Sequence, residues 1–185
     1  FEAEGITYTL IKFPELERSH GDLDILPTDR LSAAESVLRD LGYELDEDAD
    51  WFRRKYEKLV DSLQWEADIH TEAGWVGVRY LDKQTIFERS ITRKVGTSEV
   101  NVPADIDELL IWAAHDIRSN SIPLYTVLHT FSIVDDEQCR QTAREIATKN
   151  GWRAQFDAFV NAVERIYIEI YESSSVPAFE LPYEL

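Results

Sequence analysis

Several residue types that mark particular protein classes are scarce in this sequence. Among its 185 residues there is one cysteine, Cys139, and no methionine. A single cysteine excludes an internal disulfide framework and a zinc cage built from cysteines. No apolar run approaches the roughly 18 residues of a transmembrane helix, and no signal peptide stands at the start. We therefore expect a cytoplasmic protein without a membrane span, and the lack of Met at Phe1 predicts a processed or truncated chain.

Positive charge is also scarce. The chain has 19 Lys and Arg residues against 36 Asp and Glu residues, which gives a formal net charge of −17. Such a chain repels phosphate backbones, so its charge argues against a nucleic-acid partner. The acidic residues are spread over the whole length, as on the surfaces of halophilic proteins, where excess charge keeps the protein soluble. We therefore expect an acidic, halophilic surface whose charge reflects habitat more than ligand.

Apolar and aromatic residues are, in contrast, abundant. Hydrophobic residues make up 44% of the chain and aromatic residues 11%, which excludes a disordered acidic tail. The length suits one compact domain, or one domain with a helical addition.

Residues 1–100 mix strand and helix patterns. Alternating or β-branched runs predict strands, and an apolar helical periodicity predicts a helix that Thr28 caps and Gly42 ends. Strands are expected within 6–13, 23–26, 43–45, 51–60 and 63–71, and helices at 29–41 and 86–90.

The remainder of the chain has helix patterns only. Pro103 and Pro123 open two helices, and Asp135 caps a third. The expected helices are 103–119, 123–134, the segment from the Asp135 cap to 150, and 152–171, followed by a coil at 173–185. The sequence therefore predicts an α+β fold with a mixed α/β part at 1–100, an all-helical region at 101–172 and a C-terminal tail at 173–185.

Three carboxylates stand at positions that suggest a metal site. Asp22 and Asp24 are two residues apart on a predicted strand, so their side chains leave the same face. Asp68 lies on the polar face of the alternating strand 63–71. Carboxylates held close repel one another unless a cation lies between them, and Mg²⁺ prefers such oxygen ligands. The set predicts a two-metal site for phosphoryl chemistry, beside which Gly21 allows a ligand to approach the backbone.

A simpler interpretation stays open, because spaced aspartates are common on solvated strands of so acidic a chain. The apolar neighbours of the pair favour a buried strand; they are Leu23, Ile25 and Leu26. His70 shares the face of Asp68, where it either binds metal or phosphate or hydrogen-bonds a neighbour.

The order of these motifs resembles the polymerase-β-type nucleotidyltransferase superfamily, and within it an uncharacterised nucleotidyltransferase-like family. The matching segments are Leu10-Ile11-Lys12, Gly21-Asp22-Leu23-Asp24-Ile25-Leu26, Asp68-Ile69-His70, Leu109 to His115, and Pro123-Leu124-Tyr125. The similarity covers roughly residues 5 to 134. It implies a nucleotidyltransferase-like mixed-sheet palm followed by helices. It also implies Mg²⁺-dependent transfer from an NTP such as ATP to an unknown hydroxyl acceptor. Asp22 and Asp24 would then hold the metals, and Asp68 would bind metal and activate the acceptor.

One departure from the superfamily pattern concerns phosphate binding. Active members of the superfamily usually carry a Gly-Ser in the loop before the aspartate pair, whereas this chain reads Lys12-Phe13-Pro14-Glu15. Lys12 can supply a positive charge to the triphosphate instead, or it is a solvated lysine at a strand end. Ser19, His20 and Gly21 are further candidates for phosphate contacts. The departure favours a second hypothesis, a catalytically silent binding module or an antitoxin-like interaction module.

Two features of the helical region have alternative interpretations. His115-Asp116 resembles the doublet of metal-dependent HD phosphohydrolases, although a packing or capping role is simpler. The last helix carries an apolar stripe that suits core packing or, where exposed, a homo-oligomer or protein-partner face. The stripe consists of Phe156, Phe159, Val160, Val163, Ile166, Tyr167 and Ile170.

Overall fold

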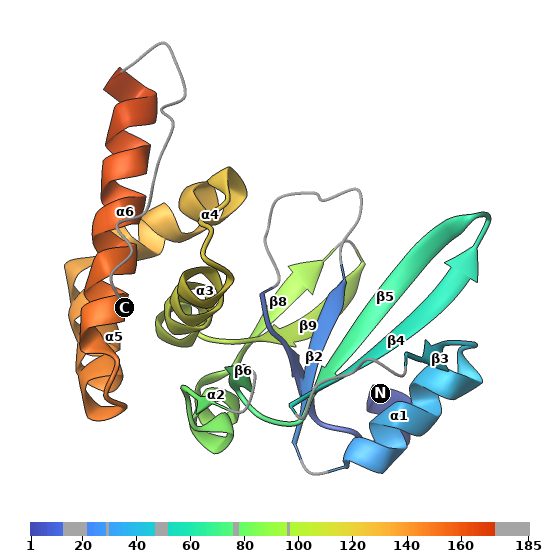
Figure 1. Cartoon of the computed structure of the whole chain (residues 1–185). Coiled ribbons are helices and arrows are strands. Elements are labelled where there is room, and N and C mark those ends of the chain that lie inside the picture. Colours follow the sequence, from blue (N-terminus) through green and yellow to red (C-terminus); the bar gives the residue numbers. More distant parts are fainter. Residues whose placement is uncertain (13–21, 29, 47–51, 76–77, 96, 173–185) are drawn as a thin grey trace. The chain divides into compact units, whose positions relative to one another are not determined.

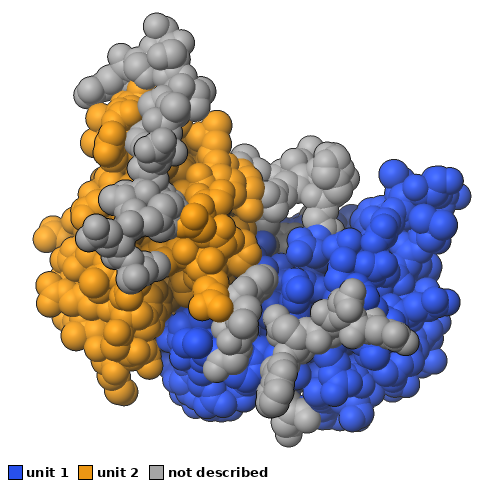
Figure 2. Space-filling view, viewed as in Figure 1, with its two compact units in different colours: residues 1–104 blue, residues 105–185 orange. Residues whose placement is uncertain are grey.

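The structure is a computed structural model that describes residues 1–12, 22–28, 30–46, 52–75, 78–95 and 97–172 (Figure 1). The chain divides into two compact units, Phe1–Ala104 and Asp105–Leu185 (Figure 2). The first contains a five-stranded mixed sheet and the second contains helices, which confirms the predicted α+β fold class.

The sheet of the first unit has the strand order β1-β2-β5-β4-β3. Its strands are β1 (Tyr8–Leu10), β2 (Leu23–Pro27), β3 (Glu44–Leu45), β4 (Arg53–Val60) and β5 (Leu63–His70). β2 and β5 run parallel, and the other neighbours are antiparallel. The two strands that carry the predicted carboxylates are therefore central neighbours (Figure 1).

Helix α1 (Leu31–Asp40) packs on one face of this sheet. Because side chains alternate along a strand, Ala67 and Ile69 of β5 turn to the α1 face while Asp68 and His70 turn to the other. The residues buried with α1 are Ile6, Leu10, Ile25, Ala34, Leu38, Tyr56, Ala67, Ile69 and Val102. The predicted alternation of strand 63–71 is thus observed in the core.

Two predicted helix caps are wrong. Arg30, not Thr28, is the N-cap of α1, because Thr28 directly follows β2 and still bonds to the β1 side of the sheet. Its amide and hydroxyl both donate to the Thr7 carbonyl oxygen, at 3.1 and 3.4 Å. Asp135 is the last residue of its helix, and the next residue, Asp136, caps the following one.

The remaining elements of the first unit are short. Helix α2 (Lys83–Arg89) begins three residues earlier than the sequence predicts, because Asp82 caps it by accepting a hydrogen bond from the Thr85 amide. The hairpins β6–β7 and β8–β9 were not predicted, since their mostly exposed strands lack a clear apolar alternation. Their strands are β6 (Gly74–Trp75), β7 (Val78–Arg79), β8 (Ile91–Val95) and β9 (Ser98–Val102).

The second unit contains the helices α3 (Asp105–Ser119), α4 (Leu124–Asp135), α5 (Glu137–Lys149) and α6 (Arg153–Glu172). Pro123 is the N-cap of α4, as its fixed backbone angle favours. The α6 stripe is largely core, since Phe156, Phe159 and Val163 are almost fully buried. Within the described residues, no helix combines the length and apolarity that crossing a membrane requires. The predicted tail at 173–185 lies outside the described residues.

Candidate functional site

Asp24 and Asp68 lie side by side at the centre of the sheet. Parallel pairing of β2 with β5 sets Asp24 opposite Asp68 and Ile25 opposite Ile69. The same register that buries the isoleucines under α1 therefore brings the two carboxylates together on the opposite face. Both side chains are nearly inaccessible to solvent, at 5% and 1% exposure.

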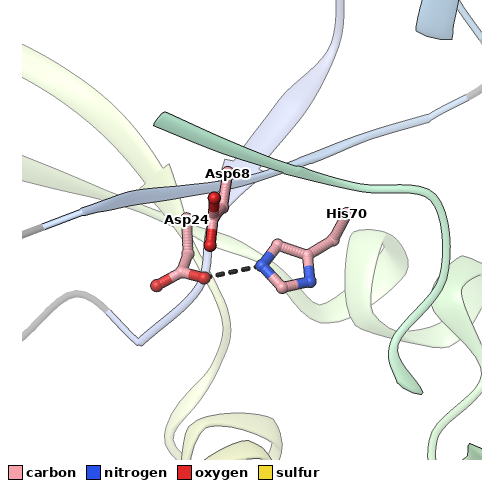
Figure 3. Close-up of side chains that lie close together, drawn as sticks. All are labelled: Asp24, Asp68 and His70. Carbon is pink, nitrogen blue, oxygen red and sulfur yellow. Dashed lines mark hydrogen bonds and ion pairs between the residues drawn. The ribbon is translucent and has the colours of Figure 1, made fainter. Parts of the chain in front are cut away.

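His70 completes a group of three. Its Nε2 lies 2.6 Å from Asp24 Oδ1 (Figure 3). Asp24, Asp68 and His70 each offer one ligand atom, and these atoms all lie within 4.8 Å of one another. An ionised carboxylate only accepts hydrogen bonds, so Nε2 carries the hydrogen and donates it to Asp24. The arrangement agrees with the simpler interpretation of His70, a bond to a neighbour, and also places its nitrogen where a metal ligand would lie.

Lys12 contacts the same oxygen of Asp24. Its Nζ lies 2.8 Å from Asp24 Oδ1, and the lysine side chain is only 10% exposed. Burial alone would raise the pKa of Asp24, but the Lys12 ammonium and the His70 hydrogen bond outweigh it and bring the pKa to about 2. Lys12 is therefore not a solvated strand-end lysine.

Asp68 has a different environment. Arg53 at the start of β4 donates from Nη1 to Asp68 Oδ2 at 3.0 Å, whereas the other oxygen, Oδ1, is buried without a hydrogen-bond partner. Burial raises the pKa of Asp68; Arg53 opposes this, and the charge of Asp24 adds to it. A buried carboxylate oxygen without a partner is costly, so this atom is suited to receive a proton or a cation.

The other predicted site residues have different places. Asp22 is exposed just before β2 and is not one of the three grouped side chains, although its charge contributes to raising the pKa of Asp68. Ser19, His20 and Gly21 lie outside the described residues.

Sequence reasoning missed Arg53 as a site residue. Arg53 pairs with His70 in the β4–β5 register, so both side chains leave the face that carries Asp68. The sequence signal was the position of Arg53 opposite His70 in the β4–β5 hairpin. This position can be recognised only once the register of β4 against β5 is known.

The grouped side chains fit a divalent cation. Two buried carboxylates and an imidazole nitrogen are donors that divalent ions accept, and the partnerless Asp68 Oδ1 supplies an available oxygen. Within the described residues this is the only such group of three or more His, Cys, Asp and Glu side chains.

The histidines of α3 and α4 bond to single carboxylates. His115 Nδ1 lies 2.9 Å from Asp116 Oδ1, and His129 Nε2 lies 2.8 Å from Glu108 Oε1. The HD phosphohydrolase interpretation therefore has no metal group to support it among the described residues.

Comparisons with known proteins agree with the geometry. The model of a family described as uncharacterised nucleotidyltransferase matches residues 5–127, which contain all three grouped side chains and both of their cationic partners. Neither the curated proteins nor the solved structures contain a match to this chain. A family match over well more than half of the sequence establishes that the chain belongs to the uncharacterised nucleotidyltransferase family.

Proposed function

We propose that this protein is a Mg²⁺-dependent nucleotidyltransferase that moves a nucleotidyl group from an NTP, ATP being one candidate, to a hydroxyl acceptor. Family membership supports a general nucleotidyltransferase role and a nucleotide substrate. The observation that carries the proposal is the register pairing of Asp24 with Asp68, which sets two buried carboxylates beside each other with one oxygen unpartnered.

Asp24, Asp68 and His70 would hold the first ion, His70 with its proton on Nδ1 instead of Nε2, and Asp22 would reach a second ion from the start of β2. When bound, such ions lower the pKa of the attacking hydroxyl and neutralise charge on the leaving pyrophosphate. Asp22 is exposed, which suits a ligand that binds the ion together with the substrate phosphates.

Asp68 is the proposed general base. Burial holds the pKa of its carboxyl above the usual value, and a raised pKa makes a carboxylate a better proton acceptor near neutral pH. With Oδ1 on the ion, Oδ2 would be the atom that takes the proton of the acceptor hydroxyl, once Arg53 releases it.

We also propose that residues 1–100 form the catalytic palm and residues 101–172 a helical region that completes the enzyme. We further propose that the protein works in the cytoplasm, and that a homo-oligomer or partner face, if one forms, involves α6. Ile168 and Tyr171 on this helix are exposed and suit such a face.

The second candidate function is a silent binding or antitoxin-like module. The observation that favours it is that Lys12 and Arg53 already neutralise Asp24 and Asp68 without a metal. Such a module would bind NTP weakly and transfer nothing.

Label transfer from α-labelled NTP to a cell-extract acceptor pool, with Mg²⁺ at fixed high salt, separates the two. For an enzyme we expect Asp24→Asn and Asp68→Asn to lower transfer by about a thousandfold or more, because metal ions supply several kcal/mol in the transition state. Asp61→Asn is the matched control: it removes one negative charge at the β4–β5 turn, where φ is +50° and asparagine is well tolerated.

A second measurement does not depend on finding the acceptor. Mg²⁺ should raise the melting temperature of wild type and Asp61→Asn but not of Asp24→Asn, since an ion that binds only the folded state stabilises it. Transfer that persists in Asp24→Asn would refute the assigned site, and metal binding without transfer would favour the silent module.

A further inference from the structure

Each of the two grouped carboxylates, Asp24 and Asp68, is paired with a positively charged side chain of the protein. Lys12 Nζ lies 2.8 Å from Asp24 Oδ1, and Arg53 Nη1 lies 3.0 Å from Asp68 Oδ2. These pairs place two positive charges where a divalent ion would also bring two. The metal-free site is thereby close to neutral despite its two buried carboxylates.

Lys12 and a divalent ion compete for one carboxylate. Asp24 Oδ1 already contacts both the Lys12 ammonium and His70 Nε2, so little of the surface of that oxygen remains for an ion. An ammonium and a divalent ion on the same carboxylate would also repel each other strongly in so buried a place. Binding of the ion at Asp24 therefore favours departure of the Lys12 ammonium.

The backbone of Lys12 suggests that its position depends on this ion pair. Lys12 has a φ of +53°, a left-handed conformation that side-chain-bearing residues rarely adopt. The preceding residue is tied to the site strand, because the Ile11 amide donates to the Asp24 carbonyl oxygen at 3.0 Å. Loss of the ion pair removes one interaction that favours this strained conformation, so the side chain can reorient over a short distance.

Arg53 is equally well placed for exchange. Its side chain is 27% exposed although its partner Asp68 is nearly buried, so part of Arg53 is accessible to solvent while its Nη1 holds the carboxylate. Guanidinium and ammonium groups bind phosphate oxygens well, the guanidinium through its planar fork.

We propose that Lys12 and Arg53 exchange Asp24 and Asp68 for the phosphate groups of the NTP when the divalent ion binds. This inference rests on the proposed function, and it adds Arg53 to the substrate-binding residues. The two cations neutralise the carboxylates before the ion arrives, and they neutralise the triphosphate afterwards.

Amine-reactive labelling of wild type, read by mass spectrometry, follows Lys12 directly. We expect low labelling without metal, severalfold higher labelling with Mn²⁺ alone, and low labelling again with Mn²⁺ and a non-hydrolysable NTP. Lys55 is the internal reference, because it lies opposite Asp68 in the register yet pairs with Glu57 and Glu66. Its labelling should not change.

Binding measurements on variants test the same exchange. Lys12→Asn suits the left-handed backbone, and we expect it to tighten Mn²⁺ binding by about tenfold, a small effect for a close ion pair. It should weaken NTP binding in the presence of Mn²⁺ by a similar factor. Arg53→Gln should also weaken NTP binding, whereas Lys55→Gln, which removes an equal charge nearby, should change neither affinity by as much.

Three outcomes are decisive. Opposite effects of Lys12→Asn on Mn²⁺ and NTP affinity, with released labelling in Mn²⁺, support the exchange. Equal labelling of Lys12 in all three states, or equal effects of Lys12→Asn and Lys55→Gln, overturn it, even if label transfer then shows that the proposed enzyme is active. Absence of Mn²⁺ and Mg²⁺ binding to wild type overturns both the exchange and the proposed function.

Discussion

Asp24 and Asp68 face each other on parallel strands but differ in how they hold a proton. Two groups, the Lys12 ammonium and the His70 imidazole, contact Asp24 and overcome the effect of burial, so its pKa falls to about 2. Asp68 accepts a hydrogen bond from Arg53 on one oxygen, and burial keeps the pKa of Asp68 above the usual value. The same strand register thus produces one firmly ionised carboxylate and one that takes up a proton more readily.

This difference predicts opposite contributions to stability. The folded pKa of Asp24 lies below its usual value of 3.8, so its contribution is complete above about pH 4 and is lost as the pH falls toward 2. At pH 7 we expect Asp24→Asn to lower the free energy of unfolding by about 2 kcal/mol. This is the free energy that corresponds to the lowering of the Asp24 pKa, at about 1.4 kcal/mol for each pKa unit. Because the pKa of Asp68 is raised, its ionised form lowers stability at pH 7, and Asp68→Asn should cost less.

Urea unfolding at pH 7 and pH 3 checks both expectations, with Asp61→Asn as the charge control. The deficit of Asp24→Asn should shrink at the lower pH, where wild type loses part of the same contribution. An Asp68→Asn protein that loses as much stability at pH 7 as Asp24→Asn would contradict this account of the two carboxylates.

At the scale of elements, the alternation of side chains along the strands and the register between strands build the site. β5 turns Ala67 and Ile69 to α1 and Asp68 to the opposite face, and β2 matches it residue for residue. A slip of one residue would bury the carboxylates under α1 and turn the isoleucines to the polar face, so the core itself enforces the pairing of Asp24 with Asp68.

Helix ends provide a second prediction at this scale. The Asp136 side chain accepts a hydrogen bond from the Cys139 amide at 3.0 Å and caps α5, whereas Asp135 ends α4. We expect Asp136→Ala to cost about 1 kcal/mol, as loss of a cap usually does. Asp135→Ala should change stability by less than about 0.5 kcal/mol. Chemical denaturation measures both, and the reverse order would show that the cap is misassigned.

At the scale of the whole molecule, charge is the dominant feature. A net charge of −17 destabilises the compact state by self-repulsion, which dissolved salt screens. We therefore expect the melting temperature to rise by at least about 2–4 °C between 0.05 and 1 M sodium chloride, a shift that corresponds to roughly 1 kcal/mol for a chain of this size. A melting temperature that falls or stays level with salt would contradict the proposed halophilic adaptation.

Local patterns in the sequence determined much of this protein. Alternation along 63–71, the prolines before α3 and α4 and the glycine after α1 mark elements by short-range chemistry, so the α+β class and most elements could be predicted. The aspartate motif and its companions also indicated the family that the comparison later established. Two helix caps and the exposed hairpins could not be predicted in the same way. A neighbouring strand decides where α1 begins, and the polar strands of the hairpins lack an apolar periodicity.

Only the tertiary structure decided which side chains meet. Lys12, Arg53 and His70 come from three separate segments, and strand pairing brings them to the two aspartates. Asp22 shares the parity of Asp24 but stands outside the group, because it lies before β2 and is exposed. The alternation of side chains along a strand decides which face a residue occupies. Its partner on that face is decided by the register between strands and by the depth of burial. Both are long-range properties that no local pattern contains.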